Sequence, residues 1–285
     1  IQLLKNDKKR DIFLLSLPVI KDRLNGYVLA GLSIQNADKK DVDLISTLGE
    51  VNFLKTGDKK YLENKKQQIL SVKPLKTNFI RRIVRTLTWT SWWRFPLTIL
   101  KPEIIAIGHN EILVQKAKSS LRRIYFYQAG ELLRKINKEK YKHQKADFLE
   151  KLCKETYETL IGDLKIQDKY FDRFNYLITG FIKDSFLRDI IKLEKCYQYK
   201  KLPKNIWIGP GTNYSFRLLA LAVLRNGGNV SSFAHATGSV LLPSYKNLYL
   251  GEFAVTNNFV DITPKAKELF YKNYLKEFPV SIHKP

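Results

Sequence analysis

Apolar and polar residues follow one another along the chain in blocks that predict an α/β protein. Several short apolar runs have the length and composition of buried parallel strands, and the clearest are residues 102–108, 123–127, 206–208 and 230–233. Helical patterns at 112–121 and 216–224 separate the first two runs and the last two runs. Each pair of runs therefore predicts a strand–helix–strand unit. Glycines at 227 and 228 mark the end of the second helix, because glycine accepts the backbone geometry that stops a helix.

The remaining sequence predicts further strands around a helical middle. Apolar runs at 11–19 and 27–34 are candidates for buried strands. Residues 131–199 are charged, contain no proline and carry apolar residues at helical spacing, which predicts several helices. Towards the C-terminus we expect short strands at 251–255 and 259–262 and a final helix at 265–278.

These elements predict an α/β fold with two Rossmann-like domains that face a cleft, joined by a helical segment. The expected boundaries are an N-terminal α/β domain at 1–135, a helical connection at 136–200 and a C-terminal α/β domain at 201–285. The chain contains no methionine, so we expect a fragment or an altered version of a natural sequence.

Charge is the strongest compositional signal. The formal net charge of +23 implies an anionic partner such as nucleic acid, acidic lipid, or a phosphorylated or carboxylated substrate. No RNA-recognition, helix-turn-helix or zinc-finger signature is present, which makes nucleic acid the less favoured partner. Two cysteines fit a reducing, cytoplasmic compartment, and the four scattered histidines predict no protein-only metal centre.

Residues 79–97 combine arginine with three of the four tryptophans. This pattern suits the interface of an anionic membrane, where indole rings lie at the level of the lipid headgroups and guanidinium groups meet phosphate. A core helix with solvated arginines, or a surface that stacks on nucleic-acid bases, gives the same pattern. We expect a peripheral protein on the inner face of the cell membrane.

Two glycine-containing loops follow predicted strands, at 209–213 and at 235–238. Ligands of open α/β sheets bind beyond the carboxyl ends of the strands, so both loops are expected at one edge. The first loop leads into a helix whose N-terminal amides favour a phosphate or carboxylate. The alternative is that the glycines only make turns and that His235 only packs or caps.

The motifs in these loops resemble a known family of enzymes. GxGxNYxxR at 209–217, a helix ending in Gly-Gly, and FAHxxG at 233–238 resemble bacterial surface-polysaccharide glycosyltransferases of the GT-B type. More narrowly, they resemble retaining transferases of 3-deoxy-manno-oct-2-ulosonic acid (Kdo), whose donor is CMP-Kdo. Those enzymes carry His-Gly-Gly where this chain has His235-Ala236-Thr237. Gly251 to Thr256 resembles the family's glutamate-bearing strand.

The resemblance implies metal-independent sugar transfer from a nucleotide donor, without a further cofactor, to a glycan or glycolipid acceptor. His235 and basic groups would stabilise the leaving phosphate, and a carboxylate would act on the acceptor or the anomeric carbon. The implied catalytic candidates are His235, Glu131 and Glu111. The implied donor-binding candidates are Gly209, Gly211, Thr212, Asn213, Arg217, Gly238 and Glu252.

Two alternatives stay open. A non-catalytic nucleic-acid-binding protein would use the same basic charge and would bind RNA or DNA in a salt-sensitive way. A different transferase, such as one that moves a polyol phosphate, would use the same architecture.

Overall fold

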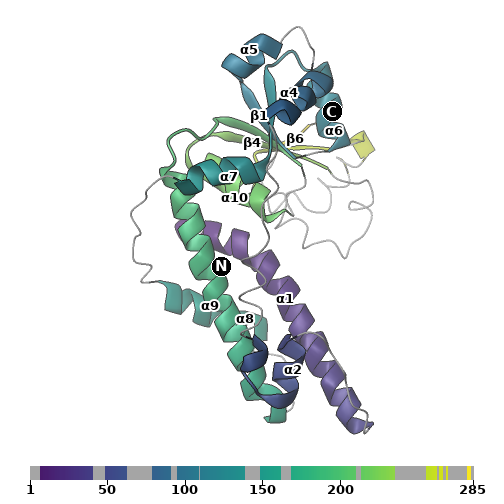
Figure 1. Cartoon of the computed structure of the whole chain (residues 1–285), viewed down its shortest axis with the longest axis vertical. Coiled ribbons are helices and arrows are strands. Elements are labelled where there is room, and N and C mark those ends of the chain that lie inside the picture. The colour runs from purple at the N-terminus through teal and green to yellow at the C-terminus, as the bar shows by residue number, and fades with distance from the viewer. Residues whose placement is uncertain are drawn as a thin grey trace. The chain divides into compact units, whose positions relative to one another are not determined.

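The computed structural model forms two compact units (Figure 1). The helical unit comprises residues 1–75 and 144–190, and the sheet unit comprises residues 76–143 and 191–285. The structure describes residues 7–40, 49–62, 79–90, 95–108, 110–138, 148–161, 168–209, 213–234, 255–261, 263–265, 268 and 281–283.

The helical unit is built on two long helices, α1 (Asp7–Lys39) and α9 (Asp168–Gln198), the second of which continues into the sheet unit. Shorter helices α2 (Gly49–Thr56) and α8 (Leu149–Ile161) belong to the same unit. Ser16 of α1 donates a buried hydrogen bond of 2.6 Å to the carboxylate of Asp189. Arg173 of α9 donates to the backbone carbonyls of Leu54 and Lys55, which satisfies acceptors at the end of α2.

The expected strands at 11–19 and 27–34 are wrong, because both runs lie inside helix α1. The buried apolar residues of α1 include Ile12, Leu15, Ile20, Leu24 and Tyr27, which follow a helical period. Polar residues on the same buried face and exposed leucines elsewhere on the helix conceal this period in the sequence.

The sheet unit contains a parallel sheet. Its described strands are β1 (Ile104–Ile107), β2 (Ile124–Tyr127), β3 (Asn205–Ile208), β4 (Asn229–Phe233), β5 (Asn258–Val260) and β6 (Ser281–His283). They form six neighbouring strands in the order β2-β1-β3-β4-β5-β6, and every neighbouring pair is parallel. This confirms the α/β class and the predicted strands at 102–108, 123–127, 206–208, 230–233 and 259–262. The predicted strand at 251–255 and the final helix lie mostly outside the described residues.

Helices cover both faces of the sheet (Figure 1). Helix α6 (Glu111–Ser119) connects β1 to β2, and α10 (Tyr214–Arg225) connects β3 to β4. The two connections run in opposite directions along the sheet, so right-handed crossovers place these helices on opposite faces. Helix α4 (Phe79–Trp89) packs on α6 and β2, whereas α7 (Ala129–Lys138) packs on α10. Helix α5 (Phe95–Leu100) also contacts β2.

The expected division of the strands between two Rossmann-like domains needs correction. Strand β1 pairs directly with β3, so both predicted strand–helix–strand units belong to one sheet. Pairing satisfies backbone groups that two separate sheets would leave at open edges.

Candidate functional site

The carboxyl edge of the sheet has the arrangement of strands beside which α/β proteins bind their ligands. The chain leaves β1 at Gly108 and β3 at Gly209, and these neighbouring strands send their connections in opposite directions. A crevice forms at such a switch point, beyond the carboxyl ends of the two strands. Gly209, where the predicted loop at 209–213 begins, therefore lies at this edge.

Asn110 links the start of helix α6 to the end of strand β4 at this edge. Its Oδ1 accepts hydrogen bonds from the backbone amides of Ile112 and Leu113, which caps helix α6. Its Nδ2 donates to the carbonyls of Phe233 and Ala234, at 3.2 and 2.7 Å. The loop after β1 is thereby joined to the end of β4, the strand that leads into the His235 loop.

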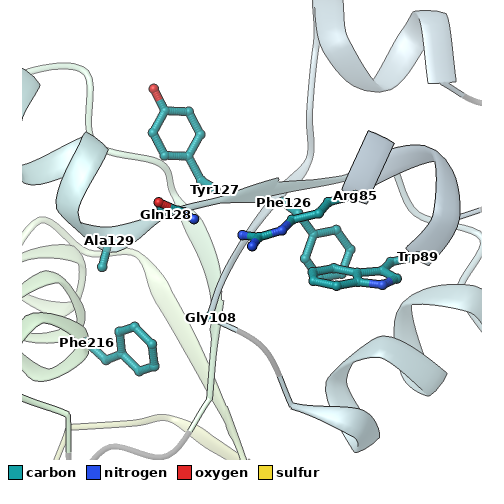
Figure 2. Close-up of a pocket in the computed structure, with 8 residues that line it drawn as sticks. All are labelled: Arg85, Trp89, Gly108, Phe126, Tyr127, Gln128, Ala129 and Phe216. Carbon is teal, nitrogen blue, oxygen red and sulfur yellow. The ribbon is translucent and has the colours of Figure 1, made fainter. Parts of the chain in front are cut away.

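A cavity of about 270 Å³ opens at the carboxyl ends of β1 and β2 (Figure 2). Aromatic side chains form much of its wall, together with an arginine, a glutamine and two small residues at strand and helix ends. The lining residues are Arg85, Trp89, Gly108, Phe126, Tyr127, Gln128, Ala129 and Phe216. Helix α7 begins at Ala129, so its N-terminal end, which favours negative charge, lies at the cavity.

Helix α4 supplies the cation of the cavity. The backbone amide of Phe126 donates to the buried hydroxyl of Thr86 at 3.4 Å, and the rings of Trp89 and Phe126 meet edge to face with centroids 4.8 Å apart. These contacts hold α4 on β2. The guanidinium carbon of Arg85 lies 5.6 Å from the centre of the Trp89 ring, and Figure 2 shows the guanidinium reaching into the cavity.

Phe216 closes the cavity from the side of α10 (Figure 2). Gly108 has a φ of +94°, in the region that favours glycine. A Cβ atom at this position would lie 2.5 Å from Cζ of Phe216. Glycine is therefore required here both for its backbone geometry and for the close approach of the ring.

The structure separates the sequence-predicted residues into accessible and buried groups. Glu111, in the first turn of α6, is exposed at the carboxyl edge. Glu131 is only 8% exposed, and Arg217 is 1% exposed. Neither of them is among the residues that line the cavity. The side chain of Asn213 caps helix α10, so the hydrogen bonds described for it hold the helix and contact no ligand.

Of the remaining predicted residues, the structure describes Gly209 alone. Gly209 lies at the end of β3, where its carbonyl accepts a hydrogen bond from Ser232 at 3.2 Å. The rest of the predicted set lies outside the described residues and comprises His235, Gly211, Thr212, Gly238 and Glu252.

Sequence reasoning did not assign the cavity walls as a site. Arg85 and Trp89 belong to the arginine- and tryptophan-rich segment, which suggested a membrane or core role. Asp261 was also missed, although it directly follows strand β5 and is buried at the carboxyl edge. It lies inside the predicted strand at 259–262, and a carboxylate near the end of that apolar run was the signal that could have identified it.

A larger hollow, of about 790 Å³, lies in the helical unit between residues of α1, α2 and α9. Three of the charged side chains in its wall already have partners, since Arg23 lies 3.6 Å from Glu50 and Lys59 lies over the Tyr176 ring. Burial, reinforced by Glu50, raises the pKa of Tyr27 to about 12, so this phenol stays protonated at neutral pH. The sheet-edge cavity is the better candidate, because it combines a cation, aromatic rings and a switch point.

Within the described ranges, no cluster of histidine, cysteine, aspartate and glutamate has the arrangement of a metal site. No helix in the described part of the chain is long and apolar enough to cross a bilayer. A scan against family models and searches of curated proteins and solved structures found no match to this chain.

Proposed function

We propose that this chain is a glycosyltransferase that takes its sugar from a nucleotide donor bound at the carboxyl edge of the sheet. The observation that carries the proposal is the cavity beside the switch point, where the Arg85 guanidinium lies among aromatic rings. A nucleotide needs both a cationic group for its phosphate and flat apolar walls for its base. CMP-Kdo is the proposed donor, on the resemblance of the loop motifs.

The chemistry of transfer assigns distinct roles to the edge residues. Negative charge develops on the leaving phosphate as the glycosidic bond breaks, and a fixed cation with nearby helix amides stabilises it. Arg85 and the start of α7 are suited to this role. His235 would join them on the evidence of its motif, since the chain enters its loop from Ala234 at the same edge.

A carboxylate is needed to accept the proton of the attacking hydroxyl. Glu111 fits this role better than Glu131, because Glu111 is exposed at the edge whereas Glu131 is buried in α7. The proposed acceptor is a glycan, and its hydroxyl would approach from the open side of the edge.

The proposal is tested by thermal unfolding of the purified chain in the presence of CMP, UDP, GDP or ADP, beside a short RNA. A ligand that binds only the folded protein stabilises it by about 2.7 kcal/mol at a concentration a hundredfold above its Kd. We expect CMP to raise the melting temperature. The shift should disappear in His235→Ala and persist in His143→Ala, which changes a histidine outside the motifs.

The other outcomes distinguish the alternatives. A shift with UDP or GDP instead of CMP would keep the glycosyltransferase and change its donor. A shift with RNA alone, lost at high salt, would overturn the proposal in favour of a nucleic-acid-binding protein that uses the charge of +23.

A further inference from the structure

Helix α4 has an apolar face that points away from the core of the sheet unit. Ile80, Val84 and Leu87 are 61%, 51% and 37% exposed. Their spacing of four and three residues places them on one side of a helix. Thr86 and Trp89 occupy the opposite side, where Thr86 is fully buried and Trp89 packs on Phe126.

The sequence around this face is uniformly basic. Residues 64–102 contain nine lysines or arginines and no aspartate or glutamate, and three of the arginines lie within α4 itself. An exposed aliphatic stripe with basic residues in the same helix matches an anionic lipid surface, whose headgroups take the cations while its acyl chains take the aliphatic groups. A nucleic acid would supply anionic phosphates for the basic residues, but it has no apolar layer that could take up the aliphatic stripe.

We propose that α4 docks the sheet unit on an anionic membrane, with Ile80, Val84 and Leu87 inserted at the boundary between headgroups and acyl chains. The opposite side of the same helix carries Trp89, and Arg85 lies between the two sides, so one short helix joins the lipid surface to the cavity. This arrangement selects a lipid-linked acceptor, and that last step alone rests on the proposed function.

The test is co-sedimentation of the full chain with vesicles of phosphatidylcholine alone or of phosphatidylcholine mixed with phosphatidylglycerol, without nucleotide. We expect binding to the mixed vesicles that weakens at high salt. The triple variant Ile80→Ser/Val84→Ser/Leu87→Ser should bind roughly a hundredfold more weakly, because three partly exposed aliphatic groups no longer leave water. Leu121→Ser, at a leucine that is 82% exposed in the same unit, should bind like the wild type.

A second measurement locates the inserted residue. An environment-sensitive fluorophore on Leu87→Cys, in a Cys153→Ser background, should shift its emission to the blue when mixed vesicles are added. The same fluorophore on Leu121→Cys should not respond. Cys196 is buried and should remain unlabelled.

Two results would overturn the inference. Equal binding by the triple variant and the wild type would mean that charge alone holds the protein on lipid. No binding of the wild type to either vesicle would mean that the face serves another partner, such as a protein. Because nucleotide is absent from these experiments, neither result bears on the proposed donor site.

Discussion

Replacing Gly108 by alanine tests the geometry of the candidate site most sharply without any ligand. Gly108 ends β1 with a φ of +94°, which an alanine adopts only under strain. The added Cβ would lie 2.5 Å from Cζ and 2.8 Å from Cε2 of Phe216, well inside the usual contact distance of about 3.5–4.0 Å. The ring, the strand end, or both must therefore move.

The cost has two parts. Backbone strain at such a position costs about 1–3 kcal/mol. Forcing an extra carbon into a filled space costs about another 1–3 kcal/mol. We therefore expect Gly108→Ala to lower the free energy of unfolding by about 2–6 kcal/mol. In a Phe216→Leu background the clashing ring atoms are gone, so the same substitution should cost only the strain.

Urea unfolding followed by tryptophan fluorescence measures this cost in the sheet unit alone. Every tryptophan of the chain belongs to that unit, at positions 89, 92, 93 and 207. The matched control is Gly130→Ala in the first turn of α7, where a Cβ meets nothing within 4 Å. Alanine should stabilise this helix by about 0.5–1 kcal/mol. If Gly108→Ala were as stable as the wild type, the described approach of Phe216 to β1 would be refuted.

Three further predictions concern a cap, a buried thiol and the two carboxylates. Asn110→Ala should lower the unfolding free energy of the sheet unit by about 2–4 kcal/mol, because it removes a helix cap and leaves buried carbonyls without their donor. Asn213→Ala should cost only the cap, about 1 kcal/mol. Equal losses in the two variants would contradict the bridging role of Asn110. Burial raises the pKa of the Cys196 thiol from 9.0 to about 12, so the unfolded chain loses this proton first and stability should fall as pH rises between these values. Cys196→Ala should reduce the dependence of the unfolding free energy on pH in this alkaline range. An unchanged pH dependence in urea titrations would argue against the raised pKa of this thiol. Glu111→Gln should lower the turnover of sugar transfer by about 10²–10⁴-fold and leave the unfolding free energy unchanged. Glu131→Gln should instead destabilise the fold by about 1–3 kcal/mol. The reverse pattern would exchange the roles of the two glutamates.

The strands of the sheet unit could be predicted because each is a short apolar run bounded by turns. The runs ending at Gly108 and Gly209 contain only buried and partly buried residues, and such runs stand out in sequence. Helix α1 could not be predicted in the same way, because Asp11 and Ser16 interrupt its buried face while Leu29 is exposed. The apolar run at its start therefore has the composition of a buried strand.

The sequence also could not show which strands share a sheet. The pairing of β1 with β3 joins segments that lie about a hundred residues apart, as in Ile105 and Ile206, and their local patterns are equally compatible with two sheets. The candidate site depends on that pairing. Arg85 reaches the cavity only because Thr86 and Trp89 anchor α4 on β2, and no local pattern records such a contact.

The proposed function requires the cavity at the carboxyl edge to bind the phosphate of a nucleotide donor. Isothermal titration of CMP into the wild type and into Arg85→Gln tests it directly, with Arg122→Gln as the control at an exposed arginine of the same unit. Loss of a hydrogen bond to a charged phosphate should weaken binding by about 10- to 100-fold in Arg85→Gln. Arg122→Gln should bind like the wild type. Equal affinity in all three proteins, or no CMP binding by the wild type, would contradict the claim.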